Sequence, residues 1–178
     1  MPGSSYLSRT YTLACLAAAG TVLAFLSPCT RPVRAQMEGD VDGYWQQRDA
    51  LDAQHAERLR DLAQRCAQLN LPAQAEVTRA WVIPRDPRRQ YLFLPPESDP
   101  AAPPGNAPTI VQQWYDKFSE VRRQQAQALF ELATVQVEAD HPTRAYQLLY
   151  EVLHEAPDHE RARAALGYRR VSGRWRRP

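Results

Sequence analysis

The feature that most constrains the fold of this chain is an internal duplication at an offset of 70 residues. Residues 54–87 align with residues 124–157, and the same offset sets Tyr44-Trp45 against Trp114-Tyr115. The identical pairs are Gln54/Gln124, Ala56/Ala126, Leu59/Leu129, Leu62/Leu132, Ala63/Ala133, Pro72/Pro142, Ala75/Ala145, Val82/Val152 and Pro87/Pro157. These pairs coincide with apolar positions and with helix-breaking prolines, so one structural unit is expected to occur twice.

Each copy predicts a long helix followed by a shorter one. The long helices carry apolar stripes whose members recur mostly every three or four residues, which places each stripe on one helix face. The first stripe is Tyr44, Leu51, His55, Leu59, Leu62, Cys66 and Leu69, and the second is Trp114, Phe118, Val121, Gln125, Leu129, Leu132 and Gln136. The shorter helices begin beside Pro72 and Pro142, because proline is tolerated in a first helical turn.

The expected fold class is therefore all-α, with antiparallel helical pairs over residues 36–87 and 110–157. Between them, residues 88–109 contain six prolines and a Gly-Asn, which predicts an extended proline-rich linker. Within it, Tyr91–Leu94 could form a short strand or a clip onto the helices. Residues 158–178 predict an unfinished third helix with Asp158 as its N-cap, a stop at Gly167, and a short extended basic tail. A Ser-Gly turn is expected within that tail.

Each 34-residue window resembles a tetratricopeptide repeat. The second window matches the pattern of that family at Leu129, Leu132, Ala133, Ala145, Leu149, Val152 and Pro157, and the first matches at Leu59, Leu62, Ala63, Ala75, Val82 and Pro87. Both windows depart from the pattern where the family has a tyrosine, at Cys66 and Gln136, and the first has Arg79 at an apolar position. The resemblance implies antiparallel helix pairs and a role in protein or peptide binding. The closing "LGYRRVSGRW" resembles in style the N-terminal regions of larger secreted bacterial proteins.

The first 35 residues have the layout of a secretory signal peptide. They contain arginines but no acidic residue, an apolar run, and small residues before a cut after Ala35. The apolar run is shorter than the roughly 20 residues needed to span a bilayer. The expected location is therefore periplasmic or extracellular. The alternatives are an inner-membrane anchor through residues 11–27 and a lipid attached at Cys29.

Charge and cysteine content exclude two further classes of protein. Residues 36–178 carry 19 basic and 20 acidic side chains, so their overall charge predicts no nucleic-acid partner. They contain a single cysteine, Cys66, which excludes an internal disulfide framework.

The stretch "HEAPDHE", residues 154–160, has the composition of a metal or acid–base site. However, His154 and His159 are five residues apart, so on one helix their side chains would diverge by about 140°. Pro157 also ends the helix between them, and we interpret the stretch as the seam between two helices. His55 and Cys66 lie on the apolar stripe and are expected in the core, and His141 is expected to cap a helix.

The C-terminal tail holds five arginines together with Tyr168 and Trp175. Arginines interleaved with aromatic residues can bind nucleic acid or an anionic surface. For an exported chain, an anionic envelope polymer or lipid is a better candidate partner than nucleic acid. The favoured alternative is the edge strand of a following domain, with the arginines on its solvated side.

The sequence thus predicts an exported, non-catalytic helical-repeat module that binds a protein or peptide and requires no cofactor or metal. Its binding face is expected on the concave side formed by the first helix of each pair. The candidate contacts are Tyr44, Trp45, Trp114, Tyr115, Phe118 and Arg122. One alternative is the N-terminal accessory region of a larger secreted or envelope-associated hydrolase. Another is self-occlusion, in which residues 91–96 occupy the groove of their own repeat.

Overall fold

The computed structural model describes residues 33–86, 89 and 91–177. Residues 1–32 of the predicted signal peptide lie outside the described residues, whereas residues 33–35 form the first turn of a helix. None of the helices in the described part of the chain is long and apolar enough to cross a bilayer.

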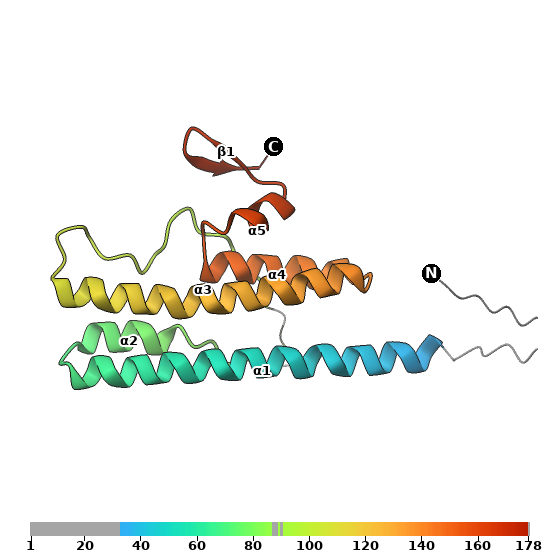
Figure 1. The fold of residues 1–178 in the computed structure, drawn as a ribbon, viewed down its shortest axis with the longest axis horizontal. Coiled ribbons are helices and arrows are strands. Elements are labelled where there is room, and N and C mark those ends of the chain that lie inside the picture. The colour runs from blue at the N-terminus through green and yellow to red at the C-terminus, as the bar shows by residue number, and fades with distance from the viewer. Residues whose placement is uncertain (1–32, 87–88, 90, 178) are drawn as a thin grey trace, which may run out of the picture.

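Over the described residues the chain is mainly helical, with one two-stranded sheet, which agrees with the prediction of an all-α fold (Figure 1). The elements in order are α1 (Val33–Gln68), α2 (Pro72–Ala80), α3 (Thr109–Glu138), α4 (Pro142–Glu155), α5 (Glu160–Ala165), β1 (Arg169–Val171) and β2 (Arg174–Arg176). α2 lies along the end of α1, and α4 lies along the end of α3. Each long helix therefore forms a hairpin with the short helix that follows it.

The two hairpins turn through the same backbone geometry. Asn70 and Asp140 take left-handed φ values of 62° and 60°, which Asn and Asp tolerate better than most residues because their short polar side chains bond locally. The next amide in each turn bonds back into the preceding helix: Leu71 N to Cys66 O at 2.9 Å and His141 N to Gln136 O at 2.8 Å. A proline then opens each short helix.

The two long helices run antiparallel, so that the start of α1 packs beside the end of α3 (Figure 1). One core cluster, here called the Trp114 junction, joins the end of α1 to the start of α3; it consists of Leu59, Cys66, Ala75, Trp114 and Phe118. The other, the Tyr44 junction, joins the start of α1 to the end of α3 and to α4. It consists of Tyr44, Ala126, Leu129, Phe130, Leu132, Ala133, Leu148, Leu149, Val152, Leu153, Ala162 and Leu166.

The segment between α2 and α3 contains neither helix nor strand in its described residues. Phe93 packs on the ring of His154 with centroids 4.8 Å apart, while Leu92 and Leu94 are exposed. Tyr91–Leu94 is therefore an irregular segment lying against α4 rather than a strand.

The C-terminal elements follow the sequence prediction except at one helix cap. Gly167, with φ of 83°, ends α5, and Ser172 and Gly173, with φ of 50° and 79°, form the turn between β1 and β2. Paired positive φ values are typical of the tight turn that matches strand twist. The prediction of Asp158 as the N-cap is wrong: His159 is the N-cap, and its Nδ1 accepts from Ala162 N at 3.2 Å. His141 is the N-cap residue of α4, as expected, but its side chain makes no capping hydrogen bond.

Candidate functional site

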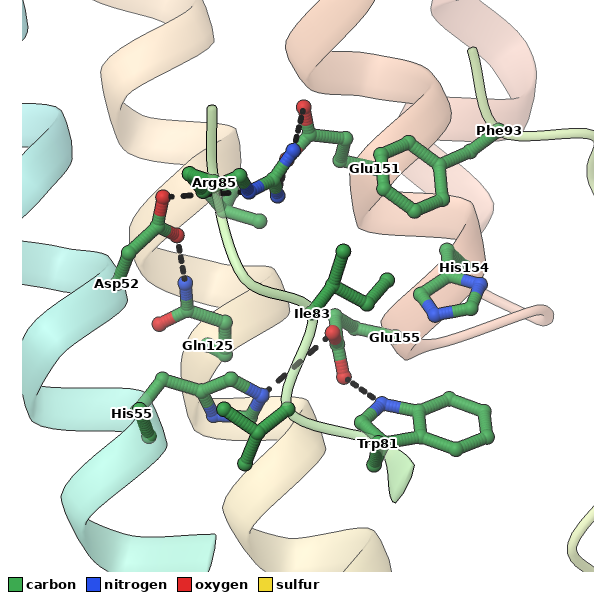
Figure 2. A pocket seen from close by; sticks show the side chains of 13 residues that line it. Asp52, His55, Trp81, Ile83, Arg85, Phe93, Gln125, Glu151, His154 and Glu155 are labelled. Atoms are coloured by element: carbon green, nitrogen blue, oxygen red, sulfur yellow. Dashed lines mark hydrogen bonds and ion pairs between the residues drawn. The ribbon is translucent and has the colours of Figure 1, made fainter. Parts of the chain in front are cut away.

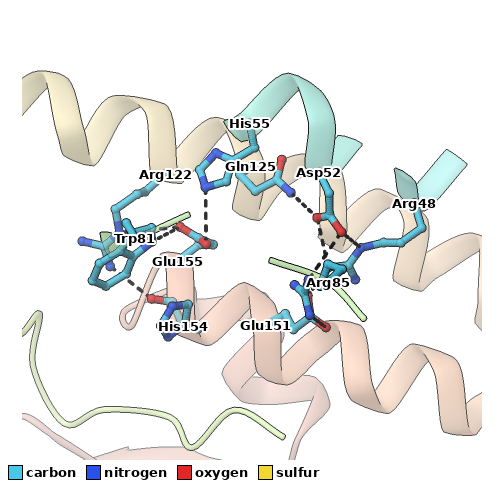
Figure 3. Close-up of polar contacts among 10 residues, drawn as sticks. All are labelled: Arg48, Asp52, His55, Trp81, Arg85, Arg122, Gln125, Glu151, His154 and Glu155. Atoms are coloured by element: carbon cyan, nitrogen blue, oxygen red, sulfur yellow. Dashed lines mark hydrogen bonds and ion pairs between the residues drawn. The ribbon is translucent and has the colours of Figure 1, made fainter. Parts of the chain in front are cut away.

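Two charged networks lie between the helical hairpins, and the first of them centres on Glu151 of α4 (Figure 3). Arg48 of α1 bonds both Asp52, at 3.0 Å and 3.2 Å, and Glu151. Arg85, which follows α2, donates to Glu151 Oε2 at 2.8 Å and lies 3.5 Å from Asp52 Oδ2. Two guanidinium groups thus face two carboxylates, and the network is neutral as a whole. Such full compensation is what a buried set of charges requires.

The second network centres on Glu155, one turn further along α4. Trp81 Nε1 donates to Glu155 Oε2 at 2.9 Å, and His55 Nε2 lies 3.5 Å from Oε1. Arg122 Nε lies 3.6 Å from the same carboxylate. Burial raises the pKa of Glu155, but the contacts from His55 and Trp81 outweigh it and leave the pKa below its ordinary value. Glu155 is therefore held as a carboxylate.

Arg122 is fully buried and anchors the linker to the helices. Its guanidinium bonds Asp99 Oδ2 at 2.6 Å and donates to the His154 carbonyl at 3.1 Å. The same group lies over the Trp81 ring at 4.1 Å, a cation–π contact in a dry setting. Trp81 stacks in turn on His154, with ring centroids 4.7 Å apart. Burial lowers the pKa of His154, which is neutral at pH 7.

A small, partly open cavity of about 40 Å³ lies between the two networks (Figure 2). Its walls include the polar ends of Asp52, His55, Glu151 and Glu155. A cavity of this size holds one or a few water molecules, whereas small-molecule sites occupy roughly 300–1,000 Å³. The cavity therefore has the size of a site for a few water molecules and is far smaller than a typical small-molecule site.

The histidines and the cysteine whose residue types could support chemistry are engaged in structural contacts, as expected from the sequence. His154 is stacked between Trp81 and Phe93, whereas His159 caps α5, so the two histidines of "HEAPDHE" do not converge. Among the described residues, no group of three metal-binding side chains comes together. Burial raises the pKa of the Cys66 thiol, which disfavours the thiolate that a nucleophile requires.

An open groove of about 520 Å³ lies between α1 and α3, on the surface of the first helix of each hairpin. It is lined by Gln54 and Arg58 of α1 and by Glu120, Arg123, Gln124, Gln125, Gln127, Ala128 and Glu131 of α3. Arg58 donates to Gln124 Oε1 at 2.8 Å across the groove, and Gln127 donates to Glu131 at 2.8 Å along its wall. Every lining residue except Ala128 has a polar side chain that can supply donors or acceptors, while the aliphatic stems of these long side chains form much of the exposed lining.

The structure divides the six predicted contact residues between the two junctions. Trp114 and Phe118 stack in the Trp114 junction, 5.3 Å apart, and Trp114 Nε1 donates to Thr78 Oγ1 at 3.0 Å. Tyr115 is half-buried and bonds Asp99 at 3.0 Å.

Tyr44 is buried at the other junction, beside Trp45. Trp45 is the most exposed of the six at 52%. Tyr44, Trp114, Phe118 and Arg122 are thus interior side chains that hold the hairpins together.

Sequence reasoning missed the residues that line the groove, although one signal pointed to them. Gln54 and Gln124 are an identical pair in the duplication, and neither belongs to an apolar stripe. A polar identity at the predicted 70-residue offset, on the faces of α1 and α3, indicates a shared surface.

Comparison with known proteins gave no match to a family model, to a curated protein or to a solved structure.

Proposed function

We propose that the chain is an exported, non-catalytic helical-repeat module that binds an extended segment of a protein or peptide in the α1–α3 groove. The observation that carries the proposal is the open groove of about 520 Å³. It lies on the first helices of the two hairpins, the face on which the tetratricopeptide resemblance places binding.

The lining of the groove suits the backbone of an extended peptide. Gln54, Gln124 and Gln127 each carry an amide with two donors and an acceptor, which complement peptide C=O and N–H groups. Arg58 and Arg123 alternate with Glu120 and Glu131, so side chains of either sign on the peptide find a partner. Recognition of this kind depends on hydrogen bonds to the peptide backbone, together with contacts to the aliphatic stems of the lining side chains.

The proposed duplication is supported by contacts that repeat with the two hairpins exchanged. Arg48 bonds Glu151. The residues 70 positions away from these two are Phe118 and Trp81, whose ring centroids lie 5.3 Å apart. Asp52 and Gln125 are within 3.4 Å, and their counterparts Arg122 and His55 both contact Glu155. These correspondences fit two copies of one unit related by an approximate twofold axis, with the groove lying across it.

Selection of peptides from a random displayed library tests the proposal. The full chain is the bait, and each enriched peptide is titrated against the variant Gln54→Ala/Gln124→Ala/Gln127→Ala. Because each lost hydrogen bond costs about 1 kcal/mol, the variant should weaken binding about a hundredfold.

The matched control is Gln64→Ala/Gln68→Ala/Gln113→Ala, which removes three exposed glutamines outside the groove lining. It should leave binding within about twofold of the unmodified chain. A library that yields no saturable peptide, or peptides that bind both triple variants equally, would count against the groove.

A further inference from the structure

The β1–β2 hairpin has two faces of different composition. The strands pair antiparallel with Arg169 opposite Arg176, Arg170 opposite Trp175 and Val171 opposite Arg174. Directly opposed residues point to the same face, and faces alternate along a strand. One face therefore carries Arg169, Val171, Arg174 and Arg176, and the other carries Arg170 and Trp175.

The face with Trp175 is turned toward α5. Trp175 Nε1 donates to Asp158 Oδ1 at 2.9 Å, and Arg170 lies 4.0 Å from Glu160. The Arg163 guanidinium lies over both the Tyr168 ring, at 4.9 Å, and the Trp175 ring, at 5.8 Å. These contacts anchor a two-stranded hairpin that would be only marginally stable alone, and they turn the other face outward.

The outward face concentrates positive charge at a structural cost. Arg169, Arg174 and Arg176 are exposed, and no ion pair joins any of them to an acidic side chain of the described chain. Like charges placed directly opposite each other destabilise a strand pair, and Arg169 and Arg176 are so placed. An anionic surface laid against this face would relieve that repulsion.

The charge of the chain is also unevenly divided. Residues 169–177 carry five arginines and no acidic residue, whereas residues 33–168 carry 15 basic and 20 acidic side chains. The helical body is thus negative and the hairpin strongly positive. A negatively charged surface would attract the hairpin and repel the body, so it would bind the molecule by this end.

We propose that the outward face of the hairpin docks peripherally onto a membrane surface rich in anionic phospholipid. The bonding groups are the guanidinium groups of Arg169, Arg174 and Arg176, which pair with phosphate oxygens. Val171, half exposed between them, lies at the level of the headgroups. This role is separate from peptide binding, because the hairpin shares no residue with the groove lining.

The composition of the outward face favours a lipid surface over a single-stranded nucleic acid. Nucleic acids without sequence preference bind to grooves in which bases stack on aromatic rings. The only aromatic side chain of the two strands, Trp175, is turned toward α5 and bonded to Asp158. The outward face offers charge and an aliphatic side chain but no stacking platform.

Co-sedimentation of the full chain with vesicles tests the proposal. One set of vesicles contains phosphatidylcholine and phosphatidylglycerol in equal amounts, and the other contains phosphatidylcholine alone. The variant Arg169→Gln/Arg174→Gln/Arg176→Gln should bind the anionic vesicles about a hundredfold more weakly, since each arginine near a charged membrane contributes roughly fivefold. Replacement of the same three residues by lysine should preserve most of the binding.

The charge-matched control is Arg60→Gln/Arg65→Gln/Arg79→Gln, which removes three exposed arginines of α1 and α2. It should stay within about twofold of the unmodified chain. The proposal is overturned if both glutamine variants lose binding equally or if the chain binds both vesicles equally. It is also overturned if the hairpin variant loses affinity for an oligonucleotide or for a second copy of the chain while its vesicle binding is unchanged. Circular dichroism of each variant distinguishes a loss of binding from a loss of folding.

Discussion

Two of the contacts that join the helical hairpins are related by the proposed 70-residue duplication but use opposite chemistry. At one end, Arg48 of α1 bonds Glu151 of α4. At the other end, Phe118 of α3 packs edge to face on Trp81. Phe118 lies 70 positions after Arg48, and Trp81 lies 70 positions before Glu151. On the proposed duplication, one backbone arrangement accepts either a buried ion pair or an aromatic pair.

The difference shows what each end contributes. An aromatic pair gains stability from buried area and adds about 0.5–1.5 kcal/mol from ring geometry. A buried ion pair gains little net stability, because desolvation of the charges offsets their attraction, but it penalises any arrangement that leaves one charge unpaired. We infer that the aromatic end supplies stability and the charged end fixes the register between α1 and α4.

The largest loss of stability is expected from the removal of Arg122, a buried charged side chain at the aromatic end. Arg122→Leu removes a fully buried guanidinium and leaves the carboxylates of Asp99 and Glu155 without it. The free energy of unfolding, measured by urea titration with circular dichroism, should fall by about 3–5 kcal/mol. The neighbouring variant Arg123→Leu alters an exposed arginine and should change stability by less than about 0.5 kcal/mol. Equal losses in the two variants would show that Arg122 is not buried in this way.

A double-mutant cycle at Arg48 and Glu151 separates register from stability. Glu151→Leu alone leaves two arginines facing Asp52 and should cost about 3 kcal/mol. Adding Arg48→Met leaves Arg85 paired with Asp52 and should recover most of that loss. The coupling energy between the two sites should be about 2 kcal/mol. Additive losses would contradict a shared buried network.

A smaller effect is expected from the hydrogen bond inside the aromatic end. Thr78→Val removes the acceptor of the buried Trp114 Nε1 and should cost about 1–2 kcal/mol, since the indole N–H is left unpaired. Thr134→Val is the matched control, because Thr134 is exposed and bonds only its own helix. Thermal unfolding of the two variants gives the comparison, and a control as damaged as Thr78→Val would contradict the assignment.

The smallest effect is a pH dependence that originates at the aromatic end. The folded chain lowers the pKa of His154 below 6.5 through burial, so the unfolded chain binds a proton there at higher pH than the folded chain does. Stability should therefore fall as pH drops below about 6.5, by at most about 1.4 kcal/mol per pH unit for this group. His154→Phe should make the decline between pH 7 and pH 5 shallower. An unchanged slope would show that His154 does not contribute to it.

The helices themselves could be predicted from local patterns, because stripes, prolines and glycines act over a few residues. The breaks beside Pro72 and Pro142 and the turn at Ser172-Gly173 followed from such signals. The antiparallel packing of α1 against α3 could not be predicted in this way. It depends on contacts such as Gln125–Asp52, between residues 73 positions apart, and no local spacing encodes that register.

The same limit explains why aromatic residues that lie in the core were predicted as binding contacts. Trp114 and Phe118 lie on an apolar stripe, and a stripe does not distinguish a core face from a partner-binding face. Their partners Thr78 and Trp81 come from the preceding hairpin. The polar members of the stripes, His55 and Gln125, were in retrospect the signal for buried polar networks between the hairpins.

The antiparallel arrangement of α1 and α3 is the central claim, and a pair of spin-label distances tests it most directly. Labels are placed at the exposed residues Gln64, Gln113 and Glu138, two at a time, in a chain whose three native cysteines are replaced by alanine. With a rise of 1.5 Å per residue, the two α3 positions are about 37 Å apart along the helix. The structure predicts a short distance from residue 64 to residue 113 and a much longer one from residue 64 to residue 138. The reverse order would mean that the long helices run parallel and would contradict the account.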